Sequence, residues 1–362
     1  MPPEAPAGLR GTVLVAGVGL LGTSVGLALS RAGVDVRLSD PQPEHVRTAS
    51  GLGAGRPAGE GDPHPCLVVV ACPPALLGEV VAAHLRAHPE AVVTDVGSVK
   101  SAPLVDVAAR VPDVADGRRY VGSHPMAGSE RSGPLAATAS LFEGRPWAVT
   151  PHARSAPEAV ETVEALAAAC GAITVRMTPD EHDRAVARTS HLPHLMAVLT
   201  AGRLAGAPAE QLALSGQGVR DVTRVAGGDP ALWRQIVAAN AGALTELLRE
   251  VRTDLDGLLA AVETGAPLEP LLEAGRAGVA AIPGKHGGTP TPVAPVYVAV
   301  PDHPGELARL FADAGEIGVN IEDVRIDHDP GRPVGLVELA VRDSHAEVLR
   351  SALESRGWTV HR

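Results

Sequence analysis

Three short motifs carry side chains suited to acid–base chemistry or to anion binding. The segment GSHPMAGSERSG (residues 122–133) holds His124 between glycines and a proline, which predicts a loop and a reachable imidazole. Because histidine exchanges protons near neutral pH, His124 is the candidate catalytic group. Ser98 in DVGSVK is a second candidate, and Arg220 and Arg224, four residues apart on a predicted helix, offer guanidinium groups that match a carboxylate.

Several neighbouring polar residues leave alternatives open. In SHLPH, His191 and His194 have no convincing third ligand for a metal, so we expect no metal and weigh a structural polar contact against a substrate contact. One arginine of the pair is expected to bond Asp221 or Asp229 and the other a substrate, unless both belong to a structural network. Trp233 is expected in core packing, with pocket lining as the alternative.

A glycine loop must position these groups. GVGLLG (17–22) follows an apolar run at 12–16 and opens a predicted helix at 18–31, which Gly33 ends. The first two glycines allow a tight turn and let backbone N–H groups approach a pyrophosphate, and the third lets the helix pack on the strand. This context predicts an NAD site formed by Gly17, Gly19, Leu20, Leu21 and Gly22.

Asp40 ends the next predicted strand, 18 residues after Gly22. A carboxylate there would bond the ribose hydroxyls and repel a 2′-phosphate, so NAD is expected in preference to NADP, although Arg47 could tolerate a phosphate. The alternative is that Asp40 only caps the turn before Pro41. Ser98 follows a later strand, where loops line the ligand crevice, and could contact the nicotinamide, cap the helix near Lys100, or do both.

Strands and helices alternate up to residue 178. Apolar runs at 12–16, 34–38, 67–71, 91–94, 147–149 and 173–175 predict strands, and helical patterns lie between them at 18–31, 76–87 and 157–169. The alternation predicts a doubly wound α/β Rossmann domain over residues 1–178.

Helices replace strands from residue 179 to 281, and we expect a substrate and dimerisation domain there. The predicted helices span 182–204, 209–225 and 230–264, the last with Asp229 as N-cap and Pro230 at its first position. Its leucines and valines from Leu244 to Val262 follow a seven-residue repeat, typical of a core helix or of a homodimer seam.

The C-terminal part reads as a small separate module. Residues 282–295 are rich in proline, glycine and threonine and predict a linker. Residues 296–362 then show a βαββαβ pattern, with helices at 304–314 and 344–355, that predicts a ferredoxin-like α+β fold.

Bulk properties limit the class of protein. The 362 residues carry a formal net charge of −11 and a pI near 5.7, which argues against a nucleic-acid partner. No apolar run is long enough to span a membrane, and no signal peptide is recognised at the N-terminus. Cys66, Cys72 and Cys170 lack metal-ligand spacing and are expected to be reduced thiols in a cytoplasmic protein.

Together these motifs resemble the prephenate/arogenate dehydrogenases of tyrosine biosynthesis. The resemblance covers nearly the whole chain and rests on GVGLLGTSVGLAL, DVGSVK, GSHPMAGSERSG, SHLPH and RDVTRVAGGDPALW, in that order. It implies an NAD-dependent oxidative decarboxylation, in which hydride leaves the ring carbon C4, the C4 hydroxyl loses its proton, and the ring carboxylate departs as CO₂. VPDHPGELARLF and GVNIEDVRI resemble an ACT domain, a regulatory fold that binds amino acids.

The resemblance also implies roles for individual residues. His124 would accept a hydrogen bond from the C4 hydroxyl, and Ser98 would orient His124 and contact the nicotinamide. Arg224 would hold a substrate carboxylate and His194 would contact the side-chain end of the substrate. The further substrate-binding candidates are Glu130 at the pocket edge, Gln217 and Ser123. In the ACT module the expected tyrosine-binding residues are Asp302, His303, Pro304, Gly305, Glu306, Gly318, Val319 and Asn320.

Four alternatives stay open. Gln217 lies where many family members have a glycine-richer run, so arogenate is an alternative substrate to prephenate. A β-hydroxyacid dehydrogenase is disfavoured because that class relies on a lysine in its helical domain, and residues 179–272 contain none. The third alternative is a non-catalytic sensor of NAD and an amino acid. The ACT module could also serve only in dimerisation.

Overall fold

The computed structural model describes residues 8–9, 11–128, 132–283, 292–328 and 334–361. The chain divides into two compact units, Met1–Thr253 and Asp254–Arg362. Within the described residues no helix has the length and apolar character needed to cross a membrane.

The first unit is built on a parallel sheet of order β3-β2-β1-β4-β5. Side chains of the central strand alternate between two hydrophobic clusters, so both faces of the sheet are covered, as a parallel sheet requires. This confirms the predicted doubly wound domain. The strands are β1 (Thr12–Ala16), β2 (Asp35–Ser39), β3 (Arg56–Pro57), β4 (Leu67–Val70) and β5 (Val92–Asp95).

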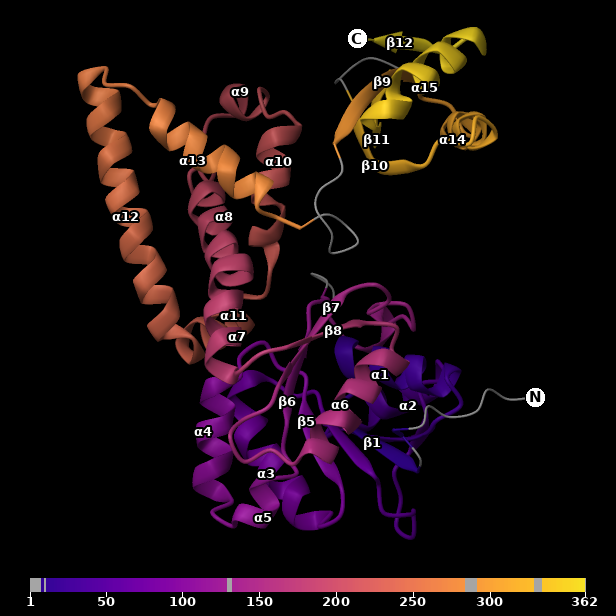
Figure 1. Cartoon of the computed structure of the whole chain (residues 1–362), viewed down its shortest axis with the longest axis vertical. Coiled ribbons are helices and arrows are strands. Elements are labelled where there is room, and N and C mark those ends of the chain that lie inside the picture. Colours follow the sequence, from indigo (N-terminus) through magenta and orange to yellow (C-terminus); the bar gives the residue numbers. More distant parts are fainter. Residues whose placement is uncertain (1–7, 10, 129–131, 284–291, 329–333, 362) are drawn as a thin grey trace. The chain divides into compact units, whose positions relative to one another are not determined.

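Helices cover the two faces of this sheet (Figure 1). One face packs against α1 (Leu20–Arg31), α2 (Pro43–Gly51) and α6 (Pro157–Ala169), and the other against α3 (Leu77–Ala87) and α4 (Ser101–Arg110). The same unit also contains the short helical turns η1 (Pro74–Leu76), α5 (Val114–Gly117) and η2 (Pro134–Ala136).

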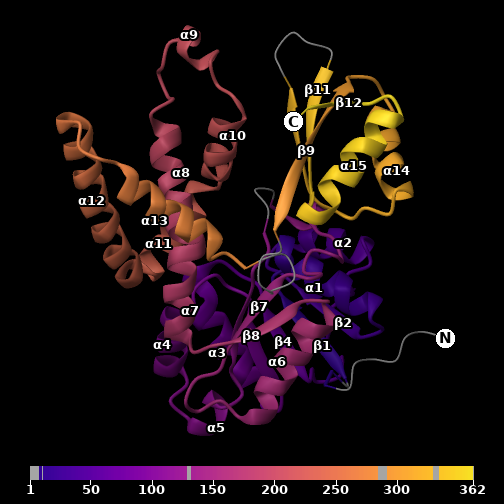
Figure 2. The same cartoon turned by 45° about the horizontal axis from the view of Figure 1, so that its top comes forward.

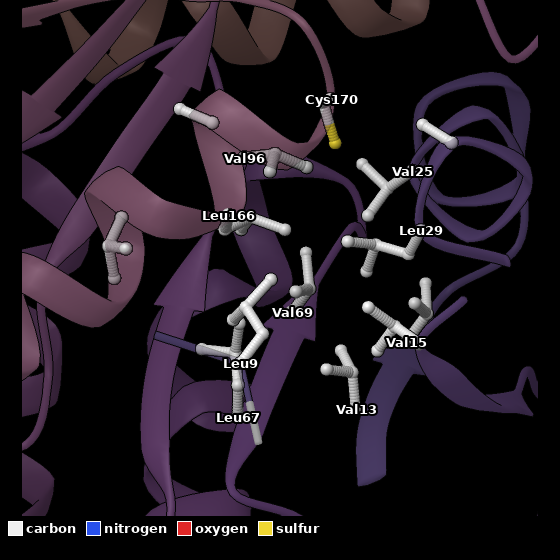
Figure 3. Close-up of a cluster of buried hydrophobic side chains, with 14 of the residues drawn as sticks. Leu9, Val13, Val15, Val25, Leu29, Leu67, Val69, Val96, Leu166 and Cys170 are labelled. Carbon is white, nitrogen blue, oxygen red and sulfur yellow. The ribbon is translucent and has the colours of Figure 1, made fainter. Parts of the chain in front are cut away.

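Figure 3 shows part of the hydrophobic core that β1, α1 and α6 share. Val13 and Val15 of β1 lie near Val25 and Leu29 of α1, and Leu166 of α6 belongs to the same cluster. Full burial of one such side chain contributes about 1.5–3 kcal/mol. The loop between β1 and α1 is therefore held by two firmly packed elements.

A second sheet of three strands follows, with order β6-β7-β8. In it β6 (Gly122–Pro125) runs antiparallel to β7 (Pro146–Thr150), and β7 runs parallel to β8 (Ile173–Arg176). A single parallel bridge between Val93 and Tyr120 places the start of β6 beside β5. The late predicted strands thus belong to a separate sheet, and β6 was not predicted at all.

The first predicted helix of the helical region differs from expectation at both its start and its middle. It begins earlier, as α7 (Pro179–Val186), because Thr178 and Glu181 form a reciprocal capping box at its N-terminus. A π-helical turn, η3 (Ala187–His191), then leads into α8 (Leu192–Gly202), and Figure 2 shows α7 and α8 running on from one another. Pro193 lacks an N–H group and crowds the preceding turn, which the wider π turn relieves.

The other two predicted helices are also divided. Residues 209–225 form α9 (Ala209–Leu212), α10 (Gln217–Thr223) and a 3₁₀ turn, η4 (Arg224–Gly227), with extended Gly216 separating the first two. Residues 230–264 form α11 (Pro230–Ala239) and α12 (Ala241–Thr264). The break falls at Asn240, whose side chain bonds other elements, and Asp229 caps α11 through Ala231 N at 2.9 Å, as predicted.

Only the first turns of α12 are buried in the chain. Leu244 and Leu247 are buried, whereas Leu255, Leu259 and Val262 are exposed. An apolar stripe of this kind on a long helix is typical of a surface that packs against another chain. Core packing is thus confirmed for the start of α12, and a homodimer seam along the rest of the helix stays a prediction.

The second unit contains a helix that was not predicted, α13 (Glu269–Ala280), and a four-stranded antiparallel sheet of order β10-β11-β9-β12. The predicted βαββαβ order is confirmed. Both helices contribute to one core with the sheet, so they cover the same face (Figure 2). The elements are β9 (Val293–Pro301), α14 (Glu306–Glu316), β10 (Ile321–His328), β11 (Val334–Arg342), α15 (Asp343–Ser355) and β12 (Thr359–His361). Because β9 begins at Val293, the predicted linker is shorter than 282–295.

Candidate active site

His124 lies on strand β6 and not on a loop, so that prediction was wrong. Backbone pairing of His124 with Ala148 on β7 overrides the turn-forming glycine and proline around it. Alternation along the strand turns neighbouring side chains to opposite faces. The imidazole of His124 is partly buried, whereas Ser123 is fully buried.

The hydroxyl of Ser123 is bonded to two protein groups. It donates to the backbone oxygen of Asp95 at 2.9 Å and accepts from Thr94 Oγ1 at 3.0 Å. With no exposed surface, this side chain does not support the predicted substrate contact. It instead joins β6 to the end of β5.

A second histidine, which the sequence analysis missed, contacts His124. Nδ1 of His124 lies 2.9 Å from Nε2 of His182 on α7, with the two rings nearly perpendicular. On the far side of the His182 ring, Nδ1 lies 2.9 Å from Oδ1 of Asp183. His182 and Asp183 are both buried, so a chain of three side chains connects β6 to α7.

The surroundings keep His124 neutral. Burial lowers the pKa of His124 well below its usual value, and the nearby His182, Lys100 and His191 act in the same direction. Burial also lowers the pKa of His182, against the opposing hydrogen bond to Asp183. A neutral imidazole at neutral pH is the form that accepts a proton.

A buried ion pair is bonded to the backbone of β6. Lys100 Nζ contacts Asp95 Oδ1 and donates to the backbone oxygen of Ser123 at 2.6 Å. The phenol of Tyr120 donates to Asp95 Oδ2 at 2.8 Å, and burial raises the pKa of Tyr120 well above its usual value. These bonds anchor the chain at Tyr120 and at Ser123, which flank the first residue of β6.

Ser98 lies at the carboxyl end of β5, partly buried in the segment that leads to α4. Among the described residues its hydroxyl has no hydrogen-bond partner, and the cap residue of α4 is Lys100. The ring atom Nδ1 of His124 is occupied by His182, so any contact of Ser98 with His124 would use Nε2. Its predicted role therefore stays a prediction.

The glycine loop has the form that a dinucleotide needs. Gly17 adopts a φ of +97°, and a Cβ there would lie 2.3 Å from the Ala71 carbonyl oxygen. A Cβ on Gly22 would lie 1.9 Å from the Gly17 oxygen, so the third glycine permits the close approach of α1. At Gly19, by contrast, a Cβ would meet nothing within 4 Å. Since α1 begins at Leu20, its unpaired N–H groups face this open position, which fits a pyrophosphate.

Asp40 binds this loop. Its Oδ2 accepts from Val18 N at 2.9 Å, and its Oδ1 accepts from Gln42 N at 2.8 Å. His45 Nδ1 lies 3.7 Å from the same carboxylate. Asp40 thus caps the turn before Pro41 and also fixes the glycine loop, while its predicted contact with ribose stays a prediction.

The two histidines of SHLPH have different surroundings. His191 Nδ1 lies 3.2 Å from Asn240 Nδ2, and burial lowers the pKa of His191 to about 4. His194 stacks on Trp233 with ring centroids 3.4 Å apart and hydrogen-bonds the Val225 backbone. Both are buried, and their contacts here are with protein groups. Within the described parts of the chain, no cluster of three or more histidine, cysteine or acidic residues could hold a metal.

The predicted substrate-binding groups on α10 and η4 are exposed. Gln217 donates to Asp221 Oδ1 at 2.8 Å, and Asp229 is occupied by its cap. Neither Arg220 nor Arg224 forms an ion pair with any described residue, so the predicted internal pairing is not seen. Glu130 lies outside the described residues.

The predicted regulatory residues form two separate turns. Asp302–Glu306 connects β9 to α14, with Gly305 at a φ of +96°, and Gly318–Asn320 connects α14 to β10. The turns lie at opposite ends of an 11-residue helix, roughly 16 Å apart at 1.5 Å per residue. A separate cavity of about 480 Å³ is lined by Pro295, Val296, Ala346, Glu347, Arg350 and His361. The predicted regulatory role of the two turns, Asp302–Glu306 and Gly318–Asn320, stays a prediction.

Several site residues were not predicted. They are His182, Asp183, Asn240, Tyr120, and the buried ion pair of Lys100 and Asp95. Asp183 follows a capping box, and a histidine and an aspartate in the first turns of a helix carry no distinctive signal. The DVGSVK motif did contain a signal, because an aspartate and a lysine at the end of a buried strand need partners.

A Rossmann sheet with an open glycine loop, followed by helices that touch a neutral histidine, defines a dinucleotide-dependent dehydrogenase. Residues 25–176 match the family model for the nucleotide-binding domain of prephenate dehydrogenase, and residues 178–273 match that for its dimerization domain. The chain belongs to the prephenate dehydrogenase family.

Two curated relatives support this membership. The probable prephenate dehydrogenase NovF of Streptomyces niveus is 36% identical over 360 residues, which is 96% of this chain and 98% of the relative. Prephenate dehydrogenase of Bacillus subtilis is 30% identical over 334 residues, or 88% of each chain.

Two solved structures share the fold of most of the chain. Prephenate dehydrogenase from A. aeolicus, in complex with hydroxyphenyl propionate and NAD⁺, has a TM-score of 0.66 at 28% identity and covers 75% of this chain and 96% of its own. Arogenate dehydrogenase from Synechocystis has a TM-score of 0.62 at 26% identity, over 74% and 98% of the two chains.

Proposed function

We propose that this protein catalyses the NAD-dependent oxidative decarboxylation of prephenate to 4-hydroxyphenylpyruvate in tyrosine biosynthesis. Family membership and the NAD complex of the A. aeolicus relative support the reaction class and the cofactor. The observation that carries the proposal is His124, a partly buried imidazole whose pKa burial lowers, on β6, where the adjacent Ser123 is bonded to the last residue of β5 in the nucleotide-binding sheet. It is the proton acceptor that this reaction requires.

The residues of the glycine loop fit NAD. Gly17, Gly19, Leu20, Leu21 and Gly22 would hold the pyrophosphate at the N-terminus of α1, with Asp40 fixing the loop and bonding the ribose. When bound, NAD⁺ accepts the hydride that leaves the hydroxyl-bearing ring carbon. Ser98, at the end of β5, would lie beside the nicotinamide.

The chain's own residues would handle the proton and the carboxylates. Nε2 of His124 accepts the hydroxyl proton while the electrons of the breaking carbon–carboxylate bond make the ring aromatic. Arg224, exposed and without an ion-pair partner among the described residues, would bind a substrate carboxylate. Gln217, His194 and Glu130 would contact the other end of the substrate.

Arogenate is the second candidate substrate. The likeness to the Synechocystis arogenate dehydrogenase supports it, and so does Gln217, a polar side chain on exposed α10 near Arg224. The two substrates differ only in a keto or amino group on the side chain. Purified protein should be given NAD⁺ with either substrate and NADH formation followed by absorbance. Turnover of prephenate supports the proposal, turnover of arogenate alone selects the alternative, and turnover of neither contradicts both.

We also propose a cytoplasmic homodimer in which residues 1–178 bind NAD, 179–281 carry the substrate and dimer surfaces, and 296–362 form an ACT domain. The match to a dimerization domain and the exposed leucines of α12 support the dimer. The βαββαβ order supports the ACT assignment. Tyrosine would bind at Asp302–Glu306 and inhibit turnover, so D302A should weaken tyrosine inhibition and leave the uninhibited rate unchanged. Inhibition that persists in D302A would contradict this site.

A further inference from the structure

We propose that His182 and Asp183 are positioning residues that fix the protonation of His124, so that Nε2 of His124 is always the acceptor atom. The inference rests on the proposed function for its catalytic meaning. Its geometric basis is a chain of hydrogen bonds that runs from Asp183 through His182 to His124.

The Asp183 carboxylate is the fixed end of this chain. Its Oδ1 accepts from Lys100 N and its Oδ2 from Ser101 N, both at 2.8 Å, at the start of the ten-residue helix α4. Burial alone would raise the pKa of Asp183, but the hydrogen bonds from His182, Ser101 and Lys100 outweigh it and lower the pKa. The N-terminus of a helix also favours a negative charge. Asp183 is therefore a carboxylate, which can only accept hydrogen bonds.

The protonation of both rings follows from this anion. Since Asp183 accepts, His182 must carry its proton on Nδ1, 2.9 Å away. A neutral His182 then has a lone pair on Nε2, so it accepts from Nδ1–H of His124 at 2.9 Å. His124, neutral in turn, is left with its lone pair on Nε2. Asn240 Nδ2 donates to the Asp183 backbone oxygen at 2.8 Å, which fixes the position of Asp183 next to His182.

The same chain can carry charge away from the reacting atoms. When Nε2 of His124 takes a proton, the proton on Nδ1 can pass to Nε2 of His182, so one proton enters and one moves on. The positive charge then lies beside the Asp183 carboxylate. The charged and titratable groups that surround His124 are His182, Lys100 and His191, and Lys100 is already paired with Asp95.

Kinetics of three variants test the relay. D183N should lower kcat by about 100-fold or more, by analogy with the usual size of general-base effects, with KM values for NAD⁺ and substrate within about threefold. H182Q keeps an oxygen that accepts Nδ1–H of His124, so it should retain more activity than H182L. D180N, an exposed aspartate on the same helix, is the matched control and should match wild type.

The tautomer itself gives a readout that a structural role would not move. In ¹⁵N NMR of the full chain, His124 (assigned with H124N) should show the Nδ1–H tautomer in wild type and H182Q, and a mixture in D183N and H182L. An Nε2–H tautomer in wild type overturns the inference, and so does wild-type kcat in D183N. Failure of wild type to turn over prephenate would instead contradict the proposed function, and the NMR would still decide the tautomer.

Discussion

Lys100 and Asp95 form an ion pair in which the two side chains are only 1% and 0% exposed. The pair spans the turn between β5 and α4 and supports the backbone of Ser123 beside the candidate proton acceptor. Burial lowers the pKa of Lys100, although the Asp95 charge opposes the shift. Because both charges have left water, each depends on the other for compensation.

Removing one partner should therefore be costly. K100M leaves a buried carboxylate with fewer donors and should lower the free energy of unfolding by about 3–5 kcal/mol. Urea unfolding of wild type and K100M measures the difference. R184M removes an exposed pair with Asp180 and should cost less than about 1 kcal/mol. Equal losses in the two variants would contradict the assignment of a special role to burial.

The glycine loop offers a matched pair of variants. G22A places a Cβ against the Gly17 oxygen and should destabilise the fold, whereas G19A meets no protein atom and should cost about 1 kcal/mol or less. G19A should nevertheless weaken NAD binding strongly, because the pyrophosphate needs that space. Calorimetric titration with NAD⁺ and thermal melts of both variants give the two answers. Normal NAD affinity in G19A would place the cofactor elsewhere.

His124 should be needed for turnover and not for cofactor binding. H124N should lower kcat by about 10²–10⁴-fold while NAD affinity stays near that of wild type. Because burial lowers the pKa of His124, it is neutral over the neutral range, and activity should fall only as pH drops well below 6.5. A pH profile of kcat/KM and a titration with NAD⁺ test both parts. A near-normal rate in H124N would remove His124 from the mechanism.

Buried neutral histidines should make the fold sensitive to acid. His191 has its pKa lowered from 6.5 to about 4, so between these values the unfolded chain binds more protons than the folded chain. Stability is then retained above pH 6.5 and lost as pH falls towards 4, by on the order of 3 kcal/mol for this residue.

In H191Q this loss should be smaller, because glutamine does not titrate and its oxygen can still accept from Asn240. Urea unfolding at several pH values compares the two proteins. H64Q, the same substitution at an exposed histidine, serves as the control. The same slope in H191Q as in wild type would show that His191 is not the residue responsible.

The two arginines of α10 and η4 can be separated by substitution. R224Q should lower kcat/KM for the substrate by about 10- to 100-fold, since a charged hydrogen bond contributes about 1.5–3 kcal/mol. R220Q should have a much smaller effect, because the proposed carboxylate contact belongs to Arg224. Steady-state kinetics of both variants decide it. The reverse order of effects would assign the substrate contact to Arg220.

The nucleotide-binding half was predictable because its signals are local. Apolar runs such as LVVV at 67–70 fit a strand buried on both faces, and α6 has the bounds that its helical pattern predicted. The glycine loop was likewise predictable, since each glycine has its own steric reason. The positions of Val25 and Leu29 on one face of α1 follow from helical periodicity.

The surroundings of His124 could not be predicted in the same way. Its strand exists because β7 pairs with it, and the turn-forming residues of GSHP give no sign of that partner. His182 reaches it from 58 residues further along the chain. The helical region was predicted with too few breaks. The break at Asn240 depends on side-chain bonds to distant residues, which are tertiary effects, whereas the π turn directly precedes Pro193 and had a local signal in the sequence.

Asp183 has consequences for protein engineering. Its carboxylate accepts bonds from the backbone at the start of α4, yet it lies on α7, beyond residue 176, where the match to the nucleotide-binding domain ends and two relatives would naturally be recombined. A chimera joined there would combine an aspartate from one parent with a helix start from the other. Parents that differ in the loop before Ser101 should thus give folded but poorly active hybrids. A different crossover would restore activity only if the start of α4 and Asp183 came from the same parent.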